Sequence, residues 1–427
     1  MDFNTLLQKA DSNKMLDEIV HRALHDNGEL KPPPQLNRKT IFTMENIARE
    51  KKLPMCETKR IAAIMWALRL LRSYYQEEEH WEDVSERLAK LVTYVLLLIK
   101  KQQNSSRDFL LYCHDFCLTI REFIENVKVV YKDLVTFCLM PLIETINANN
   151  IHVLVKKSLL LFLTDLVNMD TMEWTDDMMT SFQPHLIKLS EWVLFECGDY
   201  EVQFIAFSFI CMLTPVPRED RRRFAKTLFS RKPTICKKFS RMNFKDFDGG
   251  LKELMSVIND NRKDEKKYIY SLKCDYAIID QHFLKNRDLK VHFSTASSRL
   301  IIECFSHKLQ PFTEIEKSSI TSFEIEVVER KEDPEEISLK LFLVLKQNYR
   351  NYFDKVYEYG EVCLLFSTRR TAEILRDFVL PLIYPDFYTE VIGQNLDLFL
   401  EKMSEIENHP KTIHKDMELV TNISRRQ

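Results

Sequence analysis

Two cysteines and a histidine within five residues, Cys113, His114 and Cys117, form the grouping closest to a metal site. On a helix, Cys113 and Cys117 share one face, whereas His114 points about 100° away from them. A structural zinc site needs four ligands, and no second pair of ligands stands nearby. We interpret both cysteines as small packed side chains and expect no metal, with a metal site as the alternative.

The adjacent carboxylates Asp176 and Asp177 are the other candidates for chemistry, because paired carboxylates serve general acid–base catalysis. They follow Thr175 at the expected start of a helix, where negative charge interacts favourably with the helix dipole. With six glycines in 427 residues, the sequence contains no phosphate-binding loop. It also lacks the motifs of serine hydrolases, zinc proteases and calcium-binding loops. We expect no enzyme, no catalytic residue, no cofactor and no small-molecule substrate.

A dense run of cations is the main surface signal, opposed only by Glu219, Asp220 and Asp246. Such a run contacts DNA or an acidic partner, or it is the solvated face of a helix near the end of a helical array. We interpret it as a solvated face and keep the binding surface as the alternative. The candidate residues are Arg218, Arg221, Arg222, Arg223, Lys226, Arg231, Lys232, Lys237 and Lys238, followed by Arg241 and Lys245.

Composition limits the class of protein further. A net charge of −3 gives no overall attraction to nucleic acid or to an anionic membrane. Ten scattered cysteines without framework spacing suit a reducing compartment. No apolar run is long enough to span a bilayer, and the N-terminus lacks the pattern of a secretory signal. We expect a protein of the cytosol or nucleus with at least two domains.

Apolar residues with a helical period dominate residues 41 to 258 and predict a series of helices of roughly 15 to 22 residues each. The turn at residues 198–200 is the clearest local feature. Gly198 stands where a helix end needs a left-handed residue, and Asp199 suits the cap of the next helix. Tyr200 follows the cap, and we assign the three residues a structural role as a repeat turn. The expected helices are 58–75, 81–100, 107–125, 128–147, 152–168, 175–196 and a further group after residue 199.

The period changes after a charged linker. Phe323, Ile325 and Val327 alternate with glutamates, which predicts a strand with one solvated face. Further strands are expected at 289–293, 299–304, 337–345 and 362–366. Ser367 or Thr368 can cap a closing helix that Pro385 ends. Antiparallel strands followed by one amphipathic helix resemble a pleckstrin-homology-like barrel.

The fold class is therefore α+β and multidomain, with an armadillo- or HEAT-like helical array followed by a small antiparallel β-barrel. We expect an N-terminal helix and a proline-rich linker in residues 1–40. A polar tail with a short helix closes the chain. The boundaries are 1–40, 41–258 for the array, 259–267 for the linker, 268–385 for the barrel with its helix, and 386–427 for the tail.

The stretch CGDYEVQFIAFSFICML, the segment KKYIYSLKCDYAIID and the strand pair SFEIEVVER and ISLKLFLVL together resemble the N-terminal module of the synaptonemal complex protein 2 family. The resemblance is best from about residue 192 to residue 382. It implies an armadillo-like domain followed by a pleckstrin-homology-like domain similar to the middle domain of histone chaperones.

The resemblance also implies a non-enzymatic scaffold of the meiotic chromosome axis, the lateral element of the synaptonemal complex. The expected partners are HORMA-domain and cohesin proteins on meiotic chromosomes in the nucleus, with chromatin contact and self-association as further expectations. The chain lacks the sustained heptad repeat through which family members assemble. A closure-like segment is a hypothesis for the tail, HPKTIHKDMELVTN.

Two other readings remain open. A chromatin or histone-binding module would use the cluster of cations and the barrel. A cytosolic armadillo-type adaptor would use the barrel to bind lipid, although the loop FSTASSR carries only one arginine.

Overall fold

The structure is a computed structural model that contains two compact units. Among the described residues, unit 1 comprises those up to residue 260 and unit 2 those from Ile269 onward. The structure describes residues 38–49, 57–74, 81–102, 106–168, 176–215, 218–243, 246–260, 269–280, 282–285, 289–303, 312–330, 333–346 and 360–408.

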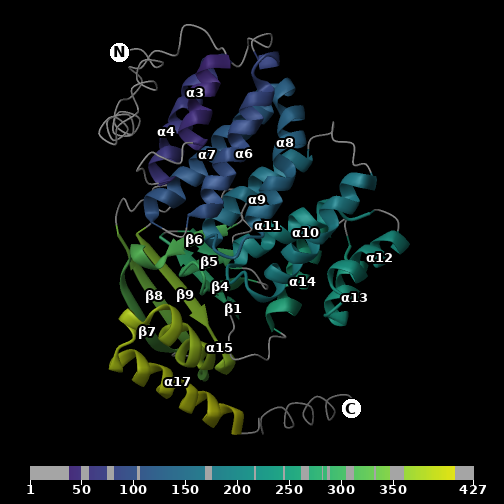
Figure 1. Ribbon diagram of the computed structural model, residues 1–427. Helices are drawn as coiled ribbons and strands as arrows, with labels where there is room; N and C mark the ends of the chain where they lie inside the picture. Colours follow the sequence, from purple (N-terminus) through teal and green to yellow (C-terminus); the bar gives the residue numbers. More distant parts are fainter. Residues whose placement is uncertain are drawn as a thin grey trace, which may run out of the picture. The chain divides into compact units, whose positions relative to one another are not determined.

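Unit 1 consists of helices in the described residues (Figure 1). The helices predicted from periodicity are confirmed, most of them within two residues of their expected ends. None of the helices in the described part of the chain is both long and apolar enough to cross a membrane. The helices are α3 (Arg38–Arg49), α4 (Glu57–Leu70), α6 (Ser85–Lys101), α7 (Arg107–Asn126), α8 (Lys128–Ile146), α9 (Val153–Asn168), α10 (Asp176–Phe195), α11 (Tyr200–Met212), α12 (Arg218–Leu228), α13 (Pro233–Arg241) and α14 (Phe247–Asp260).

The helices of unit 1 pack in two layers. From α3 to α9, each described helix contacts the one two places further along: α3 packs on α6, α6 on α8 and α8 on α10, while α4 packs on α7, α7 on α9 and α9 on α11. Consecutive helices therefore alternate between the layers, as they do in stacked helical pairs. At the C-terminal end, α10 packs on α12, and α11 packs on α14.

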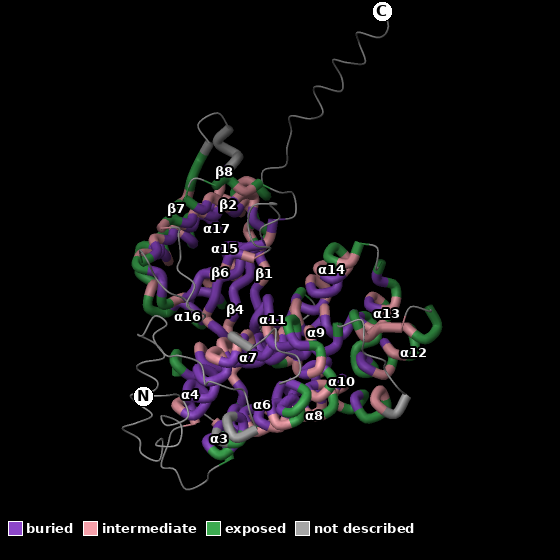
Figure 2. Tube along the Cα trace, turned by 90° about the horizontal axis from the view of Figure 1, so that it is seen from above, coloured by how far each residue is buried: buried purple, intermediate pink, exposed green. Residues whose placement is uncertain are grey.

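Helix α9 lies in the interior of unit 1, as its broad apolar stripe predicts. Twelve of its sixteen residues are buried, including Leu159, Leu160 and Leu163. Burial in α12 is limited to Ala225 and Leu228, and in α13 to Ile235 and Phe239. Figure 2 shows this contrast between the buried centre of unit 1 and the exposed α12 and α13.

Unit 2 contains two antiparallel sheets. One has the strand order β1-β4-β5-β6 and the other the order β3-β2-β9-β8-β7. The alternation that predicts a strand at 337–345 is confirmed, because Leu339, Leu341 and Leu343 are buried. The strands are β1 (Ile269–Lys273), β2 (Tyr276–Ile279), β3 (His282–Leu284), β4 (Lys290–Ser294), β5 (Arg299–Glu303), β6 (Phe312–Glu316), β7 (Ile320–Arg330), β8 (Asp333–Leu345) and β9 (Glu361–Phe366).

The described strands form two separate sheets and do not close into the expected barrel. Among the described strands, no hydrogen-bonded pair joins one sheet to the other. Between β6 and β7 the chain forms a short 3-10 helix, Lys317–Ser319, and β7 then pairs only with β8. Apolar side chains from both sheets meet in one core, which helices cover instead of further strands.

Helices at the C-terminal end complete this core. Thr368 caps α15 (Arg369–Ile374) by accepting a hydrogen bond from the Thr371 backbone N–H, as predicted. A π-helical turn (Leu375–Val379) and α16 (Leu380–Ile383) follow. Helix α17 (Glu390–Asn408) packs on β7 and β8, and its residues Leu396 and Phe399 are part of the core. The segment assigned above to a polar tail thus includes a core helix.

Helix α17 also contacts the edge of the second sheet through polar side chains. Strand β7 is an edge strand, and an unpaired edge can pair with another chain. The Asn395 side-chain amide donates a hydrogen bond of 2.7 Å to the Ile325 carbonyl oxygen on β7. Lys402 forms an ion pair with Glu329 near the end of the same strand.

A buried tyrosine provides a test of the unit 2 core. The hydroxyl group of Tyr384 is buried and has no hydrogen-bond partner within the described residues, and burial raises its pKa. Its ring lies 5.4 Å from that of Phe323, measured between centroids. Tyr384→Phe removes an unsatisfied polar group, so we expect unit 2 to gain about 1 kcal/mol of stability. Slower hydrogen exchange in β8 and β9 would report the gain, while Tyr388→Phe, at an exposed position, should leave exchange unchanged. Faster exchange in Tyr384→Phe would contradict the expectation.

Candidate binding surface

The turn between α10 and α11 has the geometry that its sequence predicts. Gly198 has φ 61°, in the left-handed region that favours glycine. Asp199 precedes the first residue of α11, and its Oδ1 accepts a hydrogen bond of 3.0 Å from the Val202 backbone N–H. Tyr200 begins α11 and is buried. These residues shape the backbone within the core and lie away from solvent.

The residues that follow this turn connect three neighbouring helices. Lys157 on α9 donates a hydrogen bond of 2.6 Å to Glu201, and both side chains are buried. The Gln203 and Asn259 amides bond to each other, at 2.9 and 3.3 Å, and join α11 to α14. Buried polar groups need such partners, so the GDYEVQ stretch is explained by structure rather than by ligand binding.

Gly198 gives a direct test of the turn. Gly198→Ala is expected to destabilise unit 1 by about 1–2 kcal/mol, because a side chain strains a left-handed backbone. Gly198→Asn should lose less stability, since asparagine tolerates the left-handed backbone region better than alanine does. Urea unfolding followed by tryptophan fluorescence measures both. Equal stability of the alanine variant and the parent would show that the turn relaxes.

The two cysteines of α7 are buried and do not form a metal site with His114. Cys113 and Cys117 are buried in α7, and burial raises the pKa of the Cys117 thiol to about 12, which disfavours the thiolate needed for metal binding. His114 instead lies 3.0 Å from the Ser158 hydroxyl. Among the residues that the structure describes, no three His, Cys, Asp or Glu side chains are grouped to hold a metal ion. Asp176 is the first residue of α10.

The single arginine of the stretch FSTASSR is the first residue of β5 and is not placed for lipid binding. Arg299 is fully buried and donates a hydrogen bond of 3.2 Å to the Ser297 hydroxyl. It also forms an ion pair with Glu314 on β6. Its charge is therefore used within unit 2, and the adaptor reading loses the one cation that this stretch offered.

The clustered cations lie on α12, on α13 and on the turn between these helices. We call these cations the basic surface. Helices α12 and α13 pack on each other, which brings the cations of both helices into one region. On α12, Arg218, Arg222 and Lys226 are exposed and four residues apart, so they form one stripe. Arg221 is half-buried. The basic surface comprises Arg218, Arg221, Arg222, Arg223, Lys226, Arg231, Lys232, Lys237, Lys238 and Arg241, while Lys245 lies outside the described residues.

Part of the basic surface is neutralised. Arg223 is 4.0 Å from Asp220, and Arg231 is 3.1 Å from Glu191. Lys238 forms an ion pair with Glu253 on α14. The ammonium group of Lys232 lies 5.1 Å from the centre of the Phe195 ring. The cations without a carboxylate partner within the described part of the chain are Arg218, Arg222, Lys226, Lys237 and Arg241.

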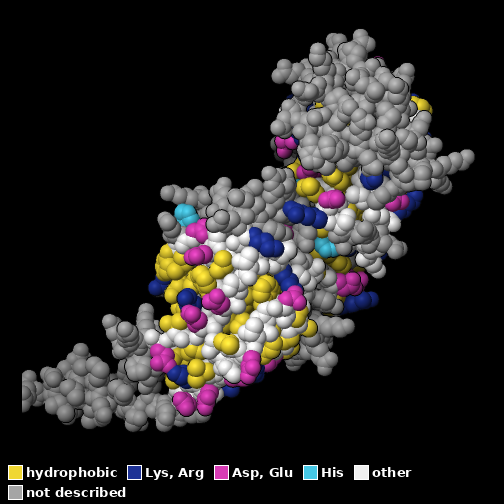
Figure 3. All heavy atoms as spheres, turned by 90° about the vertical axis from the view of Figure 1, so that its left-hand side faces the viewer, with side chains coloured by type: hydrophobic (Ala, Val, Ile, Leu, Met, Phe, Trp, Pro, Cys, Tyr) yellow, Lys and Arg dark blue, Asp and Glu magenta, His cyan; other side chains and the backbone are white. Residues whose placement is uncertain are grey.

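Cations and anions are mixed on another face of the molecule. On the face drawn in Figure 3, Lys and Arg side chains are interspersed with Asp and Glu among hydrophobic side chains.

Lys226 on α12 lies near Cys236 on α13. Burial raises the pKa of the Cys236 thiol, and the positive charge of Lys226 opposes part of this shift.

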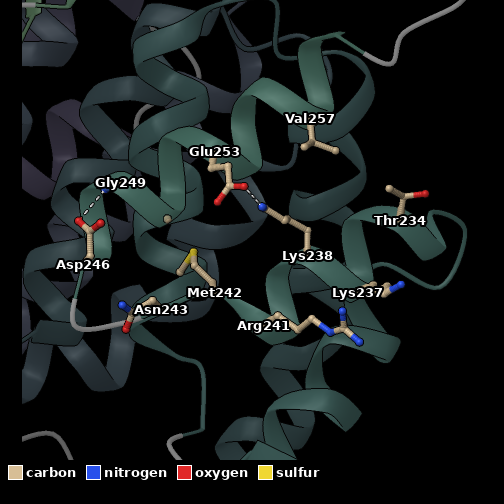
Figure 4. Close-up of a pocket in the computed structure, with 11 residues that line it drawn as sticks. Thr234, Lys237, Lys238, Arg241, Met242, Asn243, Asp246, Gly249, Glu253 and Val257 are labelled. Carbon is tan, nitrogen blue, oxygen red and sulfur yellow. Dashed lines mark hydrogen bonds and ion pairs between the residues drawn. The ribbon is translucent and has the colours of Figure 1, made fainter. Parts of the chain in front are cut away.

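A cleft of about 510 Å³ lies between α13 and α14 beside the basic surface (Figure 4). We call it the α13–α14 cleft. Asp246 accepts a hydrogen bond of 3.3 Å from the Gly249 backbone N–H and so caps α14. Gly250 allows α14 to approach Met242, because a Cβ atom there would lie 2.6 Å from Met242 Cγ. The lining residues are Thr234, Lys237, Lys238, Arg241, Met242, Asn243, Asp246, Gly249, Gly250, Glu253 and Val257.

Sequence reasoning identified the cationic wall of the cleft but missed the opposite wall. Glu253 and Val257 are four residues apart on α14 and contribute one carboxylate and one apolar group. The available signal was Asp246 followed by Gly249 and Gly250, which is typical of a capped helix start that packs closely on a neighbour.

Comparison with known proteins gives one similar fold. No model of a protein family matches the sequence, and no curated protein matches it. A solved structure described as "Synaptonemal complex protein" matches with a TM-score of 0.61 at 13% sequence identity. The match covers 89% of this chain and 99% of that chain. At this level of identity the comparison shows a shared fold, and the fold includes both helices and sheets.

Proposed function

We propose that the chain is a non-enzymatic structural protein of meiotic chromosomes. The observation that carries the proposal is the fold shared with a synaptonemal complex protein over 89% of this chain and 99% of that one. A match of this extent includes the succession of both units, which is more specific than a match to a helical array alone. The role of that protein is transferred here as a hypothesis.

The finer assignment follows the resemblance of the GDYEVQ stretch to the synaptonemal complex protein 2 family. In this proposal, unit 1 is the armadillo-like domain and unit 2 the pleckstrin-homology-like domain. The alternating layers of unit 1 and the helix-covered sheets of unit 2 support it. The chain would be a compact, diverged relative, similar to the cohesion protein orientation disruptor.

The proposed location is the chromosome axis in the nucleus, with HORMA-domain and cohesin proteins as partners. By binding these proteins, the chain would support sister-chromatid cohesion, synapsis and recombination. The closure-like segment proposed for the tail lies outside the described residues.

Localisation on spread germ-cell chromosomes in meiotic prophase tests this function. We expect the tagged chain to form continuous lines along paired chromosomes that coincide with cohesin, while the tag alone stays diffuse. A diffuse or cytoplasmic signal, together with normal axes after removal of the protein, would contradict the proposal. The shared fold would then carry a different role.

Direct binding to DNA is the second candidate, and the stripe of Arg218, Arg222 and Lys226 favours it. A histone partner fits this surface less well, because histones are themselves basic. Binding of a DNA duplex that weakens with salt and is lost in Arg222→Glu/Lys226→Glu would support this candidate. Binding that is unchanged in the double variant at low salt would remove it.

A further inference from the structure

The lining of the α13–α14 cleft combines two cations without a carboxylate partner in the described residues with two apolar side chains. Lys237 and Arg241 are exposed, stand four residues apart on α13, and have no carboxylate partner within the described residues. Both therefore project from one face of the helix at the mouth of the cleft (Figure 4). Lys238 differs, because Glu253 across the cleft neutralises it. Two positive charges thus remain available to a ligand.

Met242 and Val257 are the apolar side chains of the cleft lining, and we call them the apolar floor. Met242 is 6% exposed, and Val257 on the opposite wall is half-buried. Gly249 and Gly250 add backbone without side chains. Methionine adapts its shape to varied apolar groups, so this floor suits an inserted side chain of leucine or phenylalanine size. The cleft volume of about 510 Å³ lies within the usual range for ligand sites.

We propose that the α13–α14 cleft binds an acidic peptide segment of a partner protein. The carboxylates of the peptide reach Lys237 and Arg241, and one apolar side chain of the peptide lies against Met242 and Val257. Arginine presents a fork of donors that matches a carboxylate, whereas lysine acts as a point charge. The apolar contact adds selectivity that charge alone does not provide.

The carboxylates of the cleft favour a peptide over a nucleic acid. Asp246 and Glu253 line the cleft together with the cations. Phosphates spaced along a nucleic-acid backbone would meet these carboxylates and be repelled. A peptide can place its carboxylates at the two free cations and an uncharged group beside Asp246. The mixed charges therefore select a ligand with localised negative charge.

Fluorescence anisotropy with the purified full chain tests the proposal. The probes are short labelled peptides with aspartate and glutamate on one side of a central leucine or phenylalanine and uncharged residues on the other side. The same peptides with a central serine and a short DNA duplex serve for comparison. We expect Lys237→Glu/Arg241→Glu to weaken binding of the leucine peptide at least about tenfold, because two charge-assisted contacts are lost.

Two further variants control the result. Lys128→Glu/Lys132→Glu reverses two exposed cations four residues apart on α8, away from the cleft, and should change binding less than about twofold. Val257→Ser should weaken the leucine peptide several-fold but leave the serine peptide unchanged, because only the former uses the apolar floor. Tryptophan fluorescence and circular dichroism confirm that each variant is folded.

Three results would overturn the proposal. The first is that no acidic peptide binds at low salt. The second is that the α8 variant loses as much affinity for the leucine peptide as the cleft variant does. The third is that the DNA duplex binds more tightly than the peptides and that the cleft variant abolishes this binding. The measurement uses purified components, so it is independent of chromosome localisation. Failure here leaves the proposed meiotic role standing, and failure of localisation leaves the cleft result standing.

Discussion

Glu201→Ala is expected to destabilise unit 1 by about 3 kcal/mol or more. The Lys157 and Glu201 side chains are 8% and 12% exposed, so their charges are largely removed from water. Removing the carboxylate leaves the Lys157 ammonium buried without this partner, at the contact between α9 and α11. The cost is the desolvation of a buried ammonium group that has lost its carboxylate partner, and it exceeds the net value of the intact pair.

Urea unfolding followed by tryptophan fluorescence measures this effect. All four tryptophans, Trp66, Trp81, Trp174 and Trp192, precede residue 268, so their fluorescence reports on unit 1. Glu86→Ala is the matched control, because Glu86 pairs with Lys90 on the exposed surface of α6 and should cost less than about 0.5 kcal/mol. The apolar double variant Lys157→Met/Glu201→Leu should recover most of the loss. Equal effects of Glu201→Ala and Glu86→Ala would contradict the expectation.

Lys156→Met is expected to stabilise unit 1 at neutral pH, by about 1–3 kcal/mol. Lys156 is 2% exposed, and burial lowers its pKa from 10.5 to about 8, while electrostatic interactions with Cys197 and Glu196 oppose part of this shift. Its ammonium group lies 4.2 Å from the centre of the Trp192 ring, which offsets part of the desolvation cost. Methionine fills a similar volume without a charge.

The stability difference between Lys156→Met and the parent should depend on pH. Between pH 8 and 10.5 the unfolded chain holds the Lys156 proton and the folded chain has released it, so parental stability rises with pH in this window. Below about pH 8 the full cost of the buried charge is present. The advantage of Lys156→Met should therefore be largest at pH 7 and shrink towards pH 10. Parallel stability curves for parent and variant would contradict this, and Lys128→Met provides the exposed control.

Periodicity predicted the helices of unit 1 because each helix buries one or more faces against its neighbours. The limits of α7 and α9 follow the apolar pattern within one residue. The cap at Asp199 and the left-handed glycine at 198 were predictable, since both depend on local backbone geometry. The pairing of Gln203 with Asn259 was not, because it joins residues 56 positions apart.

Strands β1, β2, β3 and β6 escaped prediction from periodicity. Strand β3 has three residues and no buried side chain, so it shows no alternation. Every residue of β5 is buried, so this strand is recognised by its apolar run rather than by a period of two. Helix α17 was assigned to the tail, because nothing local reveals that Leu396 and Phe399 meet β7 and β8.

The candidate surface was predictable by composition alone. The density of cations from Arg218 to Arg241 is visible in the sequence. Which of them remain without a partner depends on distant carboxylates, such as Glu191 for Arg231 and Glu253 for Lys238. The α13–α14 cleft depends on the packing of two helices, and no local pattern encodes its volume.

The pairing of the strands sets an order of assembly during synthesis. In unit 1, most helices pack on partners two places along the chain, so this unit can fold while later residues are still being added. In unit 2, β2 pairs with β9, where Ala277 lies opposite Leu364. The second sheet must therefore wait until residue 366 has left the ribosome. Until then β2 can pair only with β3 among its described partners, and we expect the chain to depend most on a chaperone during this interval.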